Sequence, residues 1–143
     1  MKKLERSALV SFSDQQMFDL VNDVESYPEF INGCKRTKIL AQGEGWMEAE
    51  LDLQKAGFSQ TIATSNTVAP PTSIVLKLKS GPFKHFEGRW YFDSIKADAC
   101  KVTFTLEYEF KNKLLGMAVG KIFEQIASEQ VDAICNRAKQ IYD

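Results

Sequence analysis

Histidine is nearly absent from this sequence, and that absence limits the chemistry the chain can support. His85 is the only histidine, so a zinc or iron site built from several histidines is excluded. The sequence also lacks the GxSxG motif of the α/β-hydrolases, the phosphate-binding P-loop and the dinucleotide-binding glycine fingerprint. No motif therefore argues for an enzyme, and we expect no catalytic residues, no metal and no cofactor.

Cysteine is scarce, and long apolar runs are missing. Cys34, Cys100 and Cys135 are odd in number, and no two of them form a CxxC pair. This usage is typical of a reduced intracellular protein without disulfides. The apolar stretch near the N-terminus is too short for a secretory signal, and no run approaches the ~20 residues of a membrane span. We expect a cytoplasmic protein that touches the inner membrane only peripherally.

An excess of charge of one sign is also lacking. The formal net charge is −1, which gives no overall field that would attract DNA or an anionic membrane. Two local groups of basic side chains nevertheless stand out: Lys35, Arg36 and Lys38 in the first, and Lys77, Lys79 and Lys84 in the second. Each group is either a solvated rim or a docking patch for RNA or a phospholipid surface.

The chain is rich in the alternation of apolar and polar residues that is typical of strands. Seven segments show this alternation: residues 4–10, 34–42, 46–55, 58–67, 73–79, 84–95 and 101–110. From the second segment onwards the connections are about two to five residues long, too short for the crossovers that parallel strands need. We therefore expect one domain, residues 1–143, with an α+β fold and an antiparallel sheet.

Helical patterns occur near both ends. Ser13 and Gln16 form a capping box before a short helix, and Pro28 suits the first turn of a second short helix. Asn112 is a good N-cap for one long amphipathic helix over residues 114–142. At 1.5 Å per residue this helix would be about 43 Å long, so it has to cross the whole molecule.

A single helix cannot cover a sheet of seven strands. At a spacing of about 4.8 Å the sheet would be about 34 Å wide, whereas a helix with its side chains is about 10–12 Å across. Large aromatic residues alternate along two neighbouring strands, among them Trp90, Phe92, Phe104 and Tyr108. The uncovered part of the sheet is either packed core or a cavity, and the surplus of aromatic residues favours a cavity for a lipophilic ligand.

This order of elements resembles the helix-grip fold of the START-like superfamily of lipid-transfer proteins and polyketide cyclases. Within that superfamily the whole chain resembles the coenzyme Q-binding proteins and the bacterial ribosome association toxins. The stretches that carry the resemblance are residues 24–30 (VESYPEF) with Cys34, 81–83 (GPF), 86–92 (FEGRWYF), 104–110 (FTLEYEF) with Asn112, and Arg137 with Ala138.

The resemblance implies that the protein binds ubiquinone or another prenylated lipid in an internal cavity, in support of respiration and without turnover. Burial of one five-carbon isoprenoid unit can contribute up to about 4 kcal/mol, at about 0.8 kcal/mol per CH₂. The candidate contacts to the head group are Tyr27, Trp90 and Tyr108. The candidate contacts to the tail are Phe30, Phe92, Phe104, Leu106, Met117 and Phe123.

Two other functions stay open at this point. The toxin branch implies a protein that binds a ribosomal subunit and blocks subunit joining, with Lys35, Arg36 and Lys38 as the candidate surface. The low net charge weakens this hypothesis, because RNA-binding proteins usually show a strong basic footprint. A polyketide cyclase-type enzyme is the third function, and it is supported by fold analogy alone.

Overall fold

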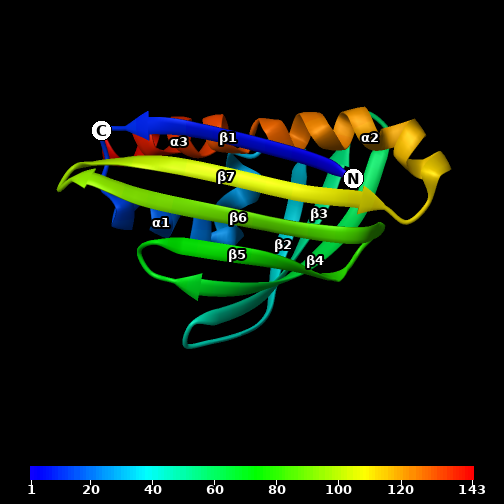
Figure 1. Ribbon diagram of the computed structural model, residues 1–143, viewed down its shortest axis with the longest axis horizontal. Coiled ribbons are helices and arrows are strands. Elements are labelled where there is room, and N and C mark those ends of the chain that lie inside the picture. The colour runs from blue at the N-terminus through cyan, green and yellow to red at the C-terminus, as the bar shows by residue number, and fades with distance from the viewer.

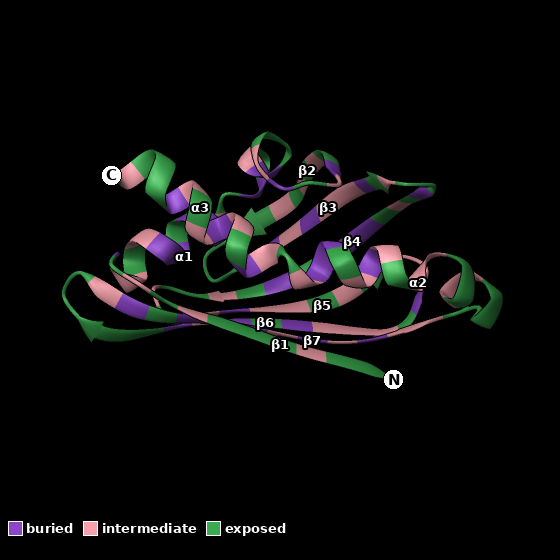
Figure 2. Cartoon of the chain, turned by 90° about the horizontal axis from the view of Figure 1, so that it is seen from above, coloured by how far each residue is buried: buried purple, intermediate pink, exposed green.

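The computed structural model describes residues 1–143 as one curved antiparallel sheet with helices against one of its faces (Figures 1 and 2). The strands are β1 (Lys2–Val10), β2 (Cys34–Gly43), β3 (Trp46–Lys55), β4 (Phe58–Ala69), β5 (Ser73–Ser80), β6 (Phe83–Lys96) and β7 (Ala99–Phe110). Their order across the sheet is β1-β7-β6-β5-β4-β3-β2, so β1 and β2 are the two edges. Every neighbouring pair is antiparallel.

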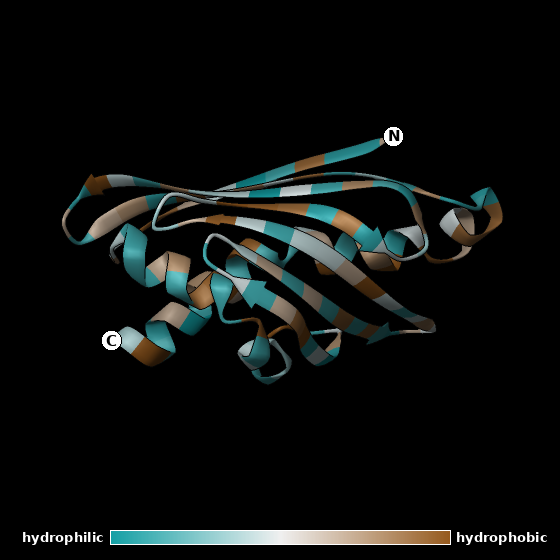
Figure 3. Ribbon diagram, turned by 90° about the horizontal axis from the view of Figure 1, so that it is seen from below, coloured by the Kyte–Doolittle hydropathy of each residue, from teal (hydrophilic) through white to brown (hydrophobic).

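All seven predicted strands are present, with ends that differ from the prediction by a few residues. Hydrophilic and hydrophobic residues alternate along them (Figure 3), as expected for a sheet with one covered face. Two of the tight connections use glycine at positive φ, Gly45 at 77° and Gly57 at 90°, where a side chain would be strained. The predicted fold class is confirmed: it is an α+β arrangement in which seven antiparallel strands wrap around a long C-terminal helical segment.

Two short helical segments, α1 (Asp14–Asn22) and η1 (Val24–Glu29), follow β1. The capping box is present: the Ser13 hydroxyl accepts from the Gln16 backbone N–H at 3.1 Å, and Gln16 Oε1 accepts from the Ser13 N–H at 2.9 Å. The prediction that Pro28 occupies the first turn of the second segment is wrong. That segment is a 3₁₀ helix in which Pro28 lies one residue before the end, because proline has no N–H with which to extend a helix.

The C-terminal segment consists of two helices, α2 (Lys113–Ser128) and α3 (Gln130–Tyr142). The prediction of one unbroken helix is therefore wrong at Glu129, whose φ of −91° and ψ of 0° depart from helical values. The side chain of Gln130 donates from Nε2 to the Ile126 carbonyl at 3.0 Å. In an unbroken helix the backbone N–H of Gln130 would use that carbonyl. The side chain thus compensates for a lost backbone bond at the bend.

The core lies between the sheet and the helices, where 29 buried residues form one cluster. At the α2 end, Phe83 is 1% exposed, and its ring centre lies 4.9 Å from that of Phe110 and 5.0 Å from that of Phe123. At the other end, Phe92 packs edge-on against Phe18 at 5.9 Å. No helix of the structure combines the length and the apolar character needed to cross a membrane.

Candidate functional site

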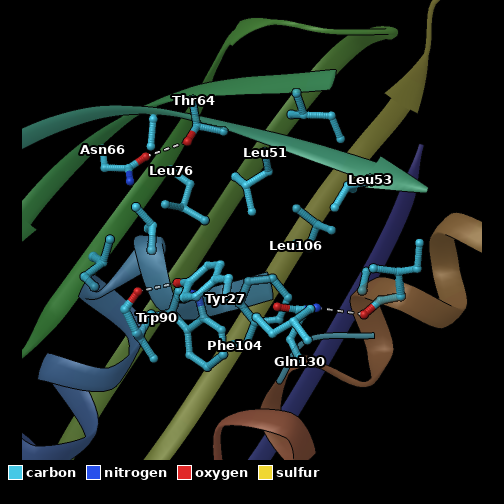
Figure 4. Close-up of a pocket in the computed structure, with 18 of the residues that line it drawn as sticks. Tyr27, Leu51, Leu53, Thr64, Asn66, Leu76, Trp90, Phe104, Leu106 and Gln130 are labelled. Carbon is cyan, nitrogen blue, oxygen red and sulfur yellow. Dashed lines mark hydrogen bonds between the residues drawn. The ribbon is translucent and has the colours of Figure 1, made fainter. Parts of the chain in front are cut away.

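A cavity of about 110 Å³ lies between the sheet and the helices, next to the bend between α2 and α3 (Figure 4). Its walls come from β3 to β7, from α1 and η1, and from Phe123, Ile126, Ala127 and Gln130 around the bend. Of its 21 lining residues 17 are hydrophobic. The concave side of the sheet is therefore mostly filled by side chains, but a predominantly apolar space remains there.

Five of the nine predicted ligand-binding residues line this cavity: Tyr27, Trp90, Phe104, Leu106 and Phe123. They come from η1, β6, β7 and α2, which are far apart in the sequence. Within this set the rings of Trp90 and Phe104 pack against each other, with centres 4.6 Å apart. Contact of these side chains with a ligand stays a prediction.

The other four predicted residues lie elsewhere. Phe92 is 1% exposed and belongs to the packed end of the core beside Phe18. Tyr108 is buried in the aromatic cluster and lies against Phe123, with ring centres 4.8 Å apart. Met117 is 82% exposed on α2. Its assignment to the tail site is corrected, because it lies on the solvent side of the helix.

Phe30 lies just outside the cavity, on the side that η1 covers. Its ring packs edge-on against Tyr27, with centres 5.9 Å apart. On another side the guanidinium of Arg137 lies 5.2 Å from the ring centre, in a cation–π contact. Arg137 Nη2 also pairs with Glu29 Oε1 at 3.0 Å. Phe30 therefore helps to join α3 to η1 and does not line the cavity.

Tyr27 is the only titratable side chain in the cavity wall. Its hydroxyl donates to the Val21 carbonyl, which fixes the ring at the end of α1. Burial, together with the nearby Cys34 and Asp23, raises the pKa of Tyr27 far above its ordinary value. The phenol is thus neutral at any physiological pH, and its proton is engaged by the Val21 carbonyl.

Sequence reasoning missed the two buried polar residues of β4, Thr64 and Asn66. They are 4% and 6% exposed, and both line the cavity. The Thr64 hydroxyl donates to Asn66 Oδ1 at 2.8 Å. The sequence held a usable signal: Ile62, Thr64 and Asn66 are two residues apart and so share one face of the strand.

The thiols lie outside the cavity and are all free. Cys34 and Cys100 are buried, and burial raises the pKa of each to about 11. Since the thiolate is the nucleophilic form, these cysteines are unreactive near neutral pH. No three His, Cys, Asp or Glu side chains gather where they could hold a metal ion.

The two groups of basic residues differ in how far their charge is neutralised. Lys77, Lys79 and Lys84 each pair with a glutamate, at 3.8, 2.8 and 4.0 Å. In the first group only Arg36 is paired, with Asp52 at 2.9 Å. Lys35 and Lys38 are exposed on the edge strand β2 without an ion-pair partner. The first group thus holds two lysines without an ion-pair partner, whereas every lysine of the second group has one.

Comparison with known proteins agrees with this architecture. The family model for polyketide cyclase/dehydrase and lipid transport proteins matches residues 10–135. A Vibrio cholerae protein named ribosome association toxin RatA is 50% identical over 142 residues, which cover 99% of each chain. A Xenopus laevis protein named coenzyme Q-binding protein COQ10 homolog B, mitochondrial, is 29% identical over 147 residues, which cover 99% of this chain and 60% of that one.

A solved structure has the same fold. The Zhui aromatase/cyclase of Streptomyces sp. R1128 matches with a TM-score of 0.87 at 16% identity, covering 99% of this chain and 96% of that one. At this level of identity the match concerns the fold alone. The resemblance inferred from the sequence motifs is thus confirmed, and the chain belongs to the polyketide cyclase/dehydrase and lipid transport family.

Proposed function

We propose that this chain binds a prenylated lipid, ubiquinone or a close relative, with part of the lipid inside the cavity. The observation that carries the proposal is a partly open pocket with 17 hydrophobic lining residues out of 21 in a member of a family that includes lipid transport proteins. The name of the Xenopus relative, a coenzyme Q-binding protein, supports the choice of ligand class. We propose binding without a chemical step.

The size of the cavity defines what it accepts. Sites for drug-sized ligands occupy roughly 300–1,000 Å³, whereas this cavity has about 110 Å³. An apolar cavity of about 150 Å³ is known to take up one benzene molecule. The space is smaller than that cavity, so even one ring or one isoprenoid unit requires it to widen slightly, and a longer chain requires it to widen further.

Affinity arithmetic leads to the same conclusion. One buried isoprenoid unit contributes up to about 4 kcal/mol, which corresponds to a Kd of about 1 mM. Micromolar binding needs about 8 kcal/mol and hence at least a second buried unit. We infer that the cavity is wider in the ligand-bound protein than in this structure.

We expect a series of ubiquinone analogues with one to four isoprenoid units to bind with increasing affinity, at least tenfold per added unit over the first steps. The readout is tryptophan fluorescence, which the quinone ring quenches. The chain has two tryptophans: Trp90 lines the cavity, and Trp46 is 45% exposed. In a Trp46→Phe background the signal comes from Trp90 alone.

The same protein provides the direct test. Organic extraction of freshly purified protein, followed by mass spectrometry, is expected to release a prenylated lipid. The proposal fails if no prenylated lipid is extracted and no analogue quenches Trp90.

A second function, association with a ribosomal subunit, is favoured by a specific observation. A relative that is 50% identical along its whole length bears the name ribosome association toxin, and this chain has a basic edge at β2. We propose that β2 is the contact surface. The two functions use different residues, since Lys35 and Lys38 face solvent and do not line the cavity.

Replacing Lys35, Arg36 and Lys38 together with glutamate is expected to reduce co-sedimentation with ribosomal subunits at least tenfold, because phosphate contacts dominate binding to RNA. The matched control replaces Lys111, Lys113 and Lys121 with glutamate, which changes the net charge equally at exposed positions around α2. Equal losses in both variants would indicate a non-specific charge effect, and unchanged binding of the β2 variant would exclude this surface.

A further inference from the structure

The amide of Asn66 is an unusual group to find in an apolar cavity wall. Apart from Thr64, it is the only buried side chain of the Ser, Thr, Asn, Gln or charged types in the whole chain. Burying an amide without hydrogen-bond partners is unfavourable, and buried polar groups in native proteins normally have partners. The amide oxygen of Asn66 has a hydrogen-bond partner, since Oδ1 accepts from the Thr64 hydroxyl at 2.8 Å.

The other half of the amide has no protein partner. The hydrogen bond from Thr64 is the only one at the Asn66 side chain, so both N–H groups of Nδ2 are free on the cavity side (Figure 4). The residues paired with Thr64 and Asn66 on β3 and β5 offer no side-chain acceptor: they are Ala49, Met47, Leu78 and Leu76. An acceptor for the Asn66 N–H groups therefore has to come from the contents of the cavity.

Thr64 gives the amide a defined orientation. A threonine hydroxyl has one proton to donate, and here that proton goes to Asn66 Oδ1. With Oδ1 engaged, Asn66 presents only donors to the cavity. We propose that the Asn66 amide, held by Thr64, donates a hydrogen bond to a carbonyl oxygen on the ring of the bound lipid. This inference rests on the proposed function and specifies which end of the ligand enters the cavity.

The ring and not the distal tail then occupies the cavity. A hydrocarbon tail has no acceptor and would leave the Asn66 N–H groups unpaired. A quinone ring carries carbonyl oxygens, and the adjacent Trp90 and Phe104 supply aromatic surfaces against which the ring can pack. The chemical class that fits is thus a ring-borne ketone with an isoprenoid substituent.

The test compares two probes of similar shape: a benzoquinone ring that carries one isoprenoid unit, and a benzene ring that carries the same unit and no oxygen. Competition against Trp90 quenching gives the affinity of each. We expect the wild-type protein to prefer the quinone about five- to tenfold, the usual worth of one neutral hydrogen bond. Asn66→Leu, which keeps the number of side-chain heavy atoms and removes the donor, is expected to bind both probes equally.

Two further variants separate this role from a structural one. Thr64→Ser keeps the hydroxyl and should retain the preference, whereas Thr64→Val together with Asn66→Leu removes both polar partners and should lose it without unfolding the protein. Infrared spectra of the bound quinone give a direct signature: a carbonyl band shifted to lower frequency in wild type and unshifted in Asn66→Leu.

The outcomes distinguish this inference from the function on which it rests. If neither probe binds to wild type, the proposed lipid binding fails. If both bind equally to wild type, or if Asn66→Leu keeps the preference and the shifted carbonyl band, lipid binding stands and the role of Asn66 is overturned. In that case the amide N–H groups are partnered by water in the cavity.

Discussion

Replacing Ala49 with leucine is expected to weaken lipid binding strongly while leaving the protein as stable as the wild type or more so. Ala49 is 1% exposed on β3 and lines the cavity. Leucine adds three carbon atoms to a space of only about 110 Å³, so the ligand ring has no room. We expect the affinity for ubiquinone analogues to fall at least tenfold in the Trp90 quenching assay.

The same substitution should raise the free energy of unfolding, whereas a mutation that disrupts the core lowers it. Filling an apolar cavity commonly adds about 0.5–2 kcal/mol to the free energy of unfolding, which urea denaturation measures. Ala118→Leu is the matched control, because Ala118 is exposed on α2 and should change neither quantity. Full ligand affinity in a stably folded Ala49→Leu protein would mean that the lipid binds elsewhere.

The largest expected loss of stability comes from Phe83→Ala. Phe83 starts β6, is 1% exposed, and has the rings of Phe110, Phe123 and Phe86 at 4.9, 5.0 and 5.1 Å. Removing a fully buried phenylalanine side chain typically lowers the free energy of unfolding by about 3–5 kcal/mol. Since the total stability of a domain is about 5–15 kcal/mol, the variant should lose a large part of it.

Urea denaturation of Phe83→Ala should therefore show a much lower midpoint at an unchanged slope. Leu9→Ala serves as the control, because Leu9 is 73% exposed on β1 and should change stability by less than about 0.5 kcal/mol. A loss of under about 1 kcal/mol for Phe83→Ala would contradict the central place that we assign to this ring.

The sheet could be predicted because its signals are local. Alternation with a period of two identifies each strand, and short connections impose antiparallel pairing on β2 to β7. The pairing of β1 with β7 is not local in the sequence and has no such signal. The bend at Glu129 could not be predicted in this way. The apolar stripe continues across it with a small drift, and only the structure shows the Gln130 side chain bonded to the Ile126 carbonyl.

The candidate site was predicted in part, for similar reasons. Periodicity shows which face of a strand is covered, but not whether a helix or empty space covers it. For this reason Trp90 lines the cavity while Phe92, two residues further along the same strand, lies in packed core. The assignment of Met117 to the tail site was avoidable. Met117 is two residues from both Leu115 and Val119, which form the apolar stripe, and a helix places such a residue on its opposite side.

Asn66 was missed because all the candidate ligand contacts were chosen among aromatic and large apolar side chains. Its position becomes clear only from the register, which sets it opposite Met47 and Leu76 on the covered face. Polar residues that break an apolar face are often functional. A search for such exceptions would have been a better guide to the site than the aromatic residues.

The two unpaired edges of the sheet have a mechanical consequence. In a closed barrel the number and stagger of the strands determine the bore. Here β1 and β2 never meet, so the curvature of the sheet is not locked by its own hydrogen bonds. All 84 backbone hydrogen bonds within the helices and strands can persist while the trough flattens and the helices above it move outwards. An open trough of this kind can widen or narrow to suit ligands of different size.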